Sequence, residues 1–259
     1  GNGWLNRKRD AAPTRGVSYD DDLGTFIRTP QLPAALGNEP FDILAWDASL
    51  MQMIEVAYEI QDQARFIAGS EESPPGEGYP YDLIFSKFRD NPDDTTKNLA
   101  KAFVDGILAV PGYGSRKITQ SVVDTSKLRA LATTLDTLAG ELLGASPPAA
   151  DIQWIRANTQ SYSDSAPMHR FFRDIYDLCL NIESRLAAYQ SVVSAAVAVR
   201  TAFSDAVVWE GHNANSPKSH GLSIDFSPGS DFMTYNALDY AGLRFGADTR
   251  WNEWLQVAP

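Results

Sequence analysis

Residues 41–82 read FDILAWDASLMQMIEVAYEIQDQARFIAGSEESPPGEGYPYD, and their pattern indicates the fold class. The nearly continuous apolar run at 41–46 predicts a buried strand, and residues 64–70 predict a second one. Between them, from Leu50 onward, apolar residues recur on one helical face and acidic residues on the other. The order of strand, turn, helix and strand predicts an α/β sheet in which the two strands run parallel.

The residues Asp47, Ala48 and Ser49 follow the first predicted strand and precede the predicted helix. Open α/β sheets hold their sites at this edge, and the N–H groups at a helix start favour negative charge and lower the pKa of a thiol. A serine there stays protonated unless a base lies beside it. Ser49 therefore has two interpretations, a helix N-cap and a nucleophile position, and the local pattern alone favours the N-cap.

The loop 71–81 is rich in Pro and Gly and follows the second predicted strand, so it is expected at the same sheet edge as Ser49. Asp47 and Glu77 are therefore predicted to converge on one pocket. Two carboxylates in such a pocket would bind a guanidinium or an ammonium group, with Arg favoured because it pairs in a bidentate manner.

Two segments, DILAWDASLMQMIEVAYEI and AGSEESPPGEGYPYD, closely resemble the nucleophile region of the clostripain family of cysteine peptidases. Family members carry a Cys between the Ala and Leu of an Asp-Ala-Cys-Leu-Met sequence, where this chain has Ser49. GNGW at the start, HGLSIDFSP and DTRWNEWLQ also resemble family segments. The resemblance implies a caspase-like three-layer α/β/α sandwich with a mainly parallel central sheet and a helical C-terminal part.

The resemblance also implies a mechanism. A Cys at position 49 would attack the peptide carbonyl, a His just before Gly1 would transfer protons, and the backbone N–H groups of Gly1 and residue 49 would hold the oxyanion. Asp47 and Glu77 match the acidic residues that line the family's pocket for the side chain before the cut. The expected partners are protein or peptide substrates with Arg or Lys at that place.

With Ser49 in place of the Cys, the chain is expected to be nearly inactive. An engineered replacement and a natural pseudopeptidase that binds Arg-containing peptides both stay open. A third alternative is a serine hydrolase that uses His220 as the base for Ser49; His212 is a further candidate base, and His169, on a predicted helix, is a weaker one.

The start of the chain reads as an exposed basic loop with interspersed Pro and Gly. The family cuts a loop soon after its catalytic His during maturation, and Arg15 is the predicted self-cleavage position here. We expect one domain with four parts: a processing loop region (1–28), an active-site core (29–90), a strand and helical region (91–205), and C-terminal strands with a closing segment (206–259).

No convincing strand is predicted between residues 1 and 39. The missing strands and the catalytic His are expected upstream, in a covalently attached segment or in a separate light chain. Elsewhere the pattern predicts helices within 82–108 and at 128–143, 152–157, 171–186 and 192–203, and strands at 118–123, 207–209 and 222–226.

The composition narrows the classes of partner. With 44% hydrophobic residues, the 259-residue chain can bury a sizeable core. Its 33 acidic against 22 basic residues, a formal charge of −11, argue against nucleic acid and against anionic membranes. There is no apolar run of membrane-spanning length and no signal peptide at its start. The resemblance implies a secreted or cell-envelope bacterial protein.

Cofactors are not expected for the chemistry. Cys179, the single cysteine, lies in a helical apolar pattern typical of core packing, and no Cys/His spacing suits a metal site. The acidic run at 20–22 lacks the alternating oxygen spacing of a calcium loop, so solvation is the favoured interpretation. The family's dependence on calcium nevertheless makes that ion worth testing.

Overall fold

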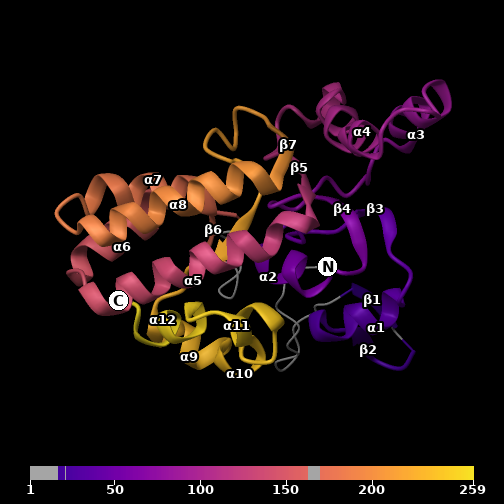
Figure 1. The fold of residues 1–259 in the computed structure, drawn as a ribbon. Helices are drawn as coiled ribbons and strands as arrows, with labels where there is room; N and C mark the ends of the chain where they lie inside the picture. Colours follow the sequence, from indigo (N-terminus) through magenta and orange to yellow (C-terminus); the bar gives the residue numbers. More distant parts are fainter. Residues whose placement is uncertain (1–16, 21, 163–169) are drawn as a thin grey trace.

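The computed structural model describes residues 17–20, 22–162 and 170–259 (Figure 1). Its strands are β1 (Val17–Asp20), β2 (Thr25–Ile27), β3 (Phe41–Ala45), β4 (Ala64–Gly69), β5 (Thr119–Asp124), β6 (Phe172–Asp174), β7 (Val207–His212) and β8 (Ser223–Asp225). Its α-helices are α1 (Leu32–Leu36), α2 (Ile54–Glu59), α3 (Tyr81–Asp90), α4 (Thr96–Leu108), α5 (Leu128–Ala145), α6 (Ala149–Asn158), α7 (Ile175–Arg185), α8 (Gln190–Ala206), α9 (Gly229–Tyr235), α10 (Ala237–Tyr240), α11 (Arg244–Asp248) and α12 (Trp251–Val257). Short 3-10 turns are η1 (Thr29–Gln31), η2 (Pro111–Tyr113) and η3 (Thr125–Lys127).

The central sheet has the strand order β3-β4-β5-β7. The pairing of β3 with β4 is parallel, as predicted, whereas β5 is antiparallel to both β4 and β7. Strands β3, β4 and β7 thus point one way and β5 the other, so the sheet is mixed. The reason lies in the connection after β4. Helices α3 and α4 return the chain to the edge of the sheet at which β4 ends, so β5 starts at that edge and runs in the opposite direction.

Each face of the sheet carries a buried apolar cluster. Successive residues of a strand point to opposite faces, and Ile67 and Val123 belong to one apolar cluster while Phe66 and Val122 belong to another. Helix α4 covers the second cluster, and α2, α5 and α8 cover the first. Figure 1 shows these helices on either side of the strands. The three-layer α/β architecture expected from the sequence is confirmed.

Helix α5 illustrates how the sequence builds the larger core. Its leucines recur at helical spacing, and Leu128, Leu131, Leu135, Leu138 and Leu142 are all fully buried. They form the face that packs on α8. The C-terminal helices complete the core beneath α5, where α12 contacts both α5 and α9.

A small hairpin corrects the expectation that no strand lies between residues 1 and 39. Strands β1 and β2 pair antiparallel, apart from the central sheet. The turn between them contains Gly24 at φ +63°, and Oδ1 of Asp20 accepts hydrogen bonds from the N–H groups of Asp22 and Leu23, each at 3.0 Å. Strands this short carry too little alternation to be detected in sequence.

A second short sheet corrects the prediction of one helix over 171–186. Residues Phe172–Asp174 form β6, which pairs antiparallel with β8, and α7 starts only at Ile175. The carboxylate of Asp174 accepts a 2.7 Å hydrogen bond from the N–H of Asp177 and so caps the helix. The predicted strand at 222–226 is confirmed as β8.

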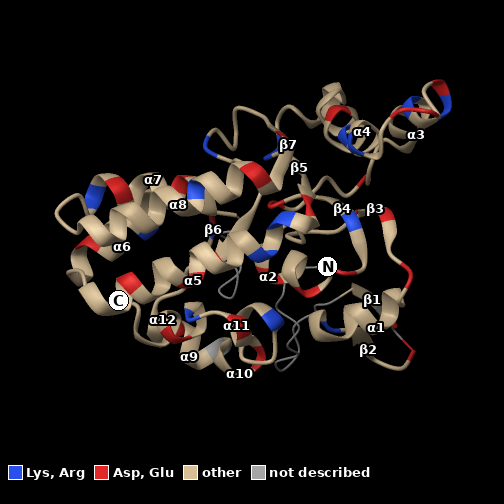
Figure 2. Ribbon diagram, in the orientation of Figure 1, with Lys and Arg blue, Asp and Glu red and all other residues tan. Residues whose placement is uncertain are grey.

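Charged residues of both signs are interspersed over the helices, as Figure 2 shows for α3, α5 and α8. Within the described ranges, none of the helices has the length and apolarity needed to cross a membrane.

Candidate active site

The loops expected to carry function gather at one edge of the central sheet. The parallel ladder continues one residue beyond β3, where the N–H of Trp46 donates to the carbonyl of Ala68 at 2.8 Å, and the chain then leaves the sheet at Asp47. Strand β4 also ends at this edge. Because β5 is antiparallel to β4 and to β7, β5 begins there and β7 ends there. The segments 47–49, 70–80, 111–118 and 213–216 are therefore neighbours.

Ser49 does not stand at the start of a helix, contrary to the expectation from sequence. Helix α2 begins at Ile54, and its N-cap is Met53. Residues 50–52 are instead hydrogen-bonded to residues 70–72: the N–H of Leu50 donates to the carbonyl of Glu72 at 3.3 Å, and that of Gln52 to the carbonyl of Ser70 at 3.1 Å. Neither the N-cap interpretation nor activation by a helix dipole applies to Ser49.

The residue after Ser49 has an unusual backbone. Leu50 has φ +60°, the left-handed region that bulky residues rarely adopt. Its side chain is fully buried, whereas Ser49 stays half-buried. The left-handed turn thus sends Leu50 into the core and leaves position 49 at the surface. Such strain persists only where surrounding contacts hold it, and it concentrates at functional sites.

Asp47 is exposed and is held by the loop that follows β4. Its Oδ2 accepts a 2.8 Å hydrogen bond from the hydroxyl of Tyr81 and a 3.2 Å bond from the N–H of Tyr79. Gly78, at φ +79°, lies so close that a Cβ atom there would be 3.1 Å from the same oxygen. Oδ1 has no hydrogen-bond partner among the described residues.

Glu77 lies on the same loop but has a partner already. Its two carboxylate oxygens accept hydrogen bonds from both terminal nitrogens of Arg116, at 2.8 and 2.9 Å. Its own backbone N–H and the Arg116 guanidinium lower the pKa of this carboxyl. The structure therefore brings the Glu77 loop against Asp47, through Tyr79, while Arg116 occupies the Glu77 carboxylate.

The two described candidate bases for Ser49, His212 and His220, each lie beside a carboxylate. Nδ1 of His212 is 3.1 Å from Oε2 of Glu210, and Nδ1 of His220 is 3.0 Å from Oδ1 of Asp174. Burial opposes the charged imidazole of His220, but the hydrogen bond and charge of Asp174 outweigh it and raise the pKa. Neither described histidine is hydrogen-bonded to Ser49. Gly1, Arg15 and His169 lie outside the described residues.

A buried carboxyl group on the loop after β4 was not anticipated from the sequence. Glu71 is 1% exposed, and its Oε2 accepts a 3.1 Å hydrogen bond from the N–H of Gly221. Burial, followed by the nearby charge of Asp174, raises its pKa well above the usual value. In sequence it is one acidic residue among others in a polar loop, and no local signal separates it from a solvated one.

Cys179 is fully buried in α7, as predicted, and burial raises the pKa of its thiol. Over the described ranges, no group of three or more His, Cys, Asp or Glu residues is arranged to hold a metal.

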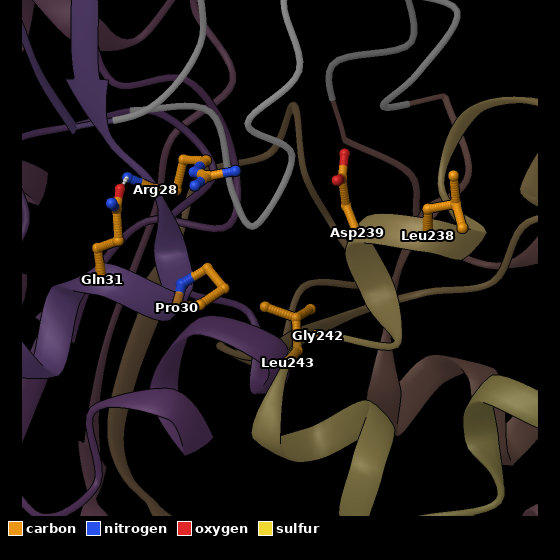
Figure 3. A pocket seen from close by; sticks show the side chains of 7 residues that line it. All are labelled: Arg28, Pro30, Gln31, Leu238, Asp239, Gly242 and Leu243. Atoms are coloured by element: carbon orange, nitrogen blue, oxygen red, sulfur yellow. Dashed lines mark hydrogen bonds between the residues drawn. The ribbon is translucent and has the colours of Figure 1, made fainter.

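A cavity of about 260 Å³ opens between η1 and α10 (Figure 3). It is lined by Arg28, Pro30, Gln31, Leu238, Asp239, Gly242 and Leu243, none of which is a predicted site residue.

A mixed sheet between two helical layers, with its polar loops gathered where β3 and β4 end, defines a protein of the caspase-like class. The chain belongs to the clostripain family, whose model matches residues 1–257. It is thus a cysteine peptidase by family, a hydrolase whose chemistry needs no cofactor. Comparison with curated proteins gave no match.

Solved structures support the fold. An inactive zymogen of a C11 protease from Parabacteroides distasonis is 22% identical at a TM-score of 0.67, with 96% of this chain and 67% of that chain covered. A cysteine protease from B. fragilis is 17% identical at 0.62, with 93% and 99% covered. A secreted C11 cysteine protease from Bacteroides thetaiotaomicron, solved with an irreversible peptide inhibitor, is 18% identical at 0.58, with 93% and 69% covered.

Proposed function

We propose that this protein is an endopeptidase that cleaves proteins after Arg or Lys and processes itself, and that the form with Ser49 is inactive. The observation that carries the proposal is the position of Asp47. It is exposed, two residues before position 49, and its Oδ1 has no partner among the described residues. A carboxylate fixed beside the nucleophile position would bind the cationic side chain that precedes the cut.

The proposed chemistry follows from position 49. A Cys there would attack the carbonyl carbon as a thiolate, and the backbone N–H groups of Gly1 and residue 49 would hold the oxyanion. A His just before Gly1 would protonate the leaving amine and then activate the water that releases the acyl group. A serine at position 49 is far less acidic than a cysteine, so the first step would fail.

An upstream segment is part of the proposal. Strand β3 is an end strand of the central sheet as described, and its first residue, Phe41, is 46% exposed. A strand that pairs with this edge would cover Phe41 and bring an upstream His to the edge that holds position 49. We propose that such a segment, attached or as a light chain, completes the site, and that the protein is secreted or held in the bacterial cell envelope.

The Ser49→Cys variant, in a protein extended upstream through the family His, tests the function. Both forms are assayed with and without calcium. Cleavage of peptides after Arg or Lys is expected from this variant and not from the Ser49 form. A folded Ser49→Cys protein that binds such peptides but never cuts them would favour the pseudopeptidase. Cleavage by the Ser49 form that disappears in Ser49→Ala and in His220→Gln would favour the serine hydrolase.

A further inference from the structure

The ion pair between Arg116 and Glu77 blocks one of the two carboxylates that the sequence assigns to the substrate pocket. Nη1 of Arg116 donates to Oε2 of Glu77 at 2.8 Å, and Nη2 donates to Oε1 at 2.9 Å. This is the bidentate geometry that an arginine of a substrate would itself adopt with Glu77. A substrate cation that approaches Glu77 therefore finds its negative charge already balanced by Arg116.

Arg116 is held in place by more than this pair. Its carbonyl accepts hydrogen bonds from the side-chain amides of Asn213, at 2.6 Å, and Asn215, at 2.9 Å. Its N–H donates to the carbonyl of Tyr113, and the hydroxyl of Tyr113 donates to the carbonyl of Gly78 at 2.8 Å. The turn that carries Arg116 is thus fixed to the loop after β7 and to the loop of Glu77. These contacts fix the backbone of Arg116, and the planar guanidinium then pairs with Glu77 in a geometry that matches a carboxylate.

We propose that Arg116 is a specificity-determining residue: it neutralises Glu77 and leaves Asp47 as the one carboxylate that binds the cationic side chain of the substrate. The inference rests on the proposed function. A second guanidinium that approached Glu77 would either have to displace Arg116 or lie beside its positive charge. A pocket with one open carboxylate oxygen accepts an ammonium group as well as a guanidinium, so Lys and Arg substrates should bind with similar affinity.

A double-mutant cycle tests the assignment, with Glu77→Gln, Arg116→Gln and the two changes combined in the Ser49 protein that includes its upstream segment. The probes are fluorescein-labelled tetrapeptides ending in arginine amide, lysine amide or citrulline amide, and fluorescence anisotropy gives each Kd. Citrulline has the shape of arginine without its charge. Both positions are solvent-exposed, and circular dichroism checks the fold of each variant.

Opposite shifts are expected from the two single variants. Glu77→Gln leaves the positive charge of Arg116 unpaired and should weaken binding of the arginine peptide about threefold or more; Arg116→Gln frees the Glu77 carboxylate and should strengthen it by a similar factor. The double variant has the parent's net charge and should bind within about twofold of the parent. The ratio of arginine to lysine affinity should rise in Arg116→Gln alone, because two carboxylates then face the guanidinium.

Two results would overturn the inference. A double variant as weak as Glu77→Gln would show that Glu77 itself binds the substrate, and unchanged affinities in all variants would show that the pair does not influence the pocket. Arg89→Gln is the matched control, since Arg89 forms a similar exposed pair with Asp90 at the far end of α3. A parent that fails to prefer the arginine over the citrulline peptide would instead refute the proposed function.

Discussion

The hydroxyl of Tyr81 donates a 2.8 Å hydrogen bond to Oδ2 of Asp47, which joins the first residue of α3 to the turn that carries Ser49. Partial burial, together with this hydrogen bond, raises the pKa of Tyr81, so the hydroxyl stays protonated and keeps its proton directed at the carboxylate. The N–H of Tyr79 holds the same oxygen from the other side of the loop. These two donors leave Oδ1 as the oxygen that a substrate cation would meet.

The first prediction concerns this pair. Asp47→Asn in the Ser49→Cys protein should lower kcat/KM for arginine substrates about 30-fold or more, a loss of about 2 kcal/mol of transition-state stabilisation, because the pocket loses this carboxylate. Tyr81→Phe should reduce transition-state stabilisation for the same substrates by about 1 kcal/mol, since Asp47 keeps its hydrogen bond from the N–H of Tyr79. Steady-state kinetics on arginine and citrulline peptides measure both. Equal arginine preference in Asp47→Asn and its parent would show that selectivity arises elsewhere.

The second prediction concerns maturation. We expect the Ser49→Cys protein to cut itself after Arg15 and the Ser49 form to remain whole, because the Arg15 loop would reach a site whose His directly precedes Gly1. Lys8 and Arg9 are closer in sequence to Gly1, which the proposed site would hold, and should therefore be harder to place in the pocket. Mass spectrometry of both purified forms, with Arg15→Ala as the control, identifies the cut. Equal cutting of the two forms would assign the event to another protease.

The third prediction concerns a buried acid in the core. Glu55 is 0% exposed, and its Oε1 accepts hydrogen bonds from the N–H of Asp225, at 2.9 Å, and the hydroxyl of Tyr240, at 3.0 Å. Burial and then the charge of Asp225 raise its pKa from 4.5 to about 8. The unfolded chain releases this proton near pH 4.5 and the folded chain only near pH 8, so stability falls as the pH rises between these values.

Glu55→Gln should remove this contribution, because glutamine does not titrate. Urea unfolding at pH 5.5 and pH 8.0 should therefore show a smaller loss of stability in the variant than in the parent, by about 1 kcal/mol or more. Glu253→Gln, on the exposed face of α12, is the control and should keep the parent's dependence. An identical loss in Glu55→Gln and the parent would contradict the raised pKa.

The fourth prediction concerns Gly221, which joins the loop of His220 to Glu71. It has φ +106°, and a Cβ there would lie 2.6 Å from Cβ of Ser121. Gly221→Ala should lower the free energy of unfolding by about 2 kcal/mol or more, through backbone strain and overpacking. Gly112→Ala, where no heavy atom lies within 4 Å of the added Cβ, should change it by less than about 0.5 kcal/mol. Chemical denaturation compares the two, and equal effects would contradict this account.

Elements that depend on local pattern were predictable from the chain alone. The apolar run of β3, the second strand β4 and the leucine spacing of α5 were each predicted within a few residues of their observed bounds. The turn at residues 47–49 was placed correctly at the end of β3, because a break in an apolar run is visible in the chain alone. The same pattern marked Asp47 as a candidate site residue.

Features that depend on partners distant in sequence became visible only in the folded protein. Helix α2 starts at Ile54 rather than near Leu50, because residues 50–52 bond to the loop after β4 and not to the next helical turn. The reversed direction of β5 follows from the path of α3 and α4. The Arg116 partner of Glu77 lies 39 positions along the chain, and the Gly221 partner of Glu71 lies 150 positions along it. No periodicity encodes such pairs, because they form only when the folded sheet brings its loops to one edge.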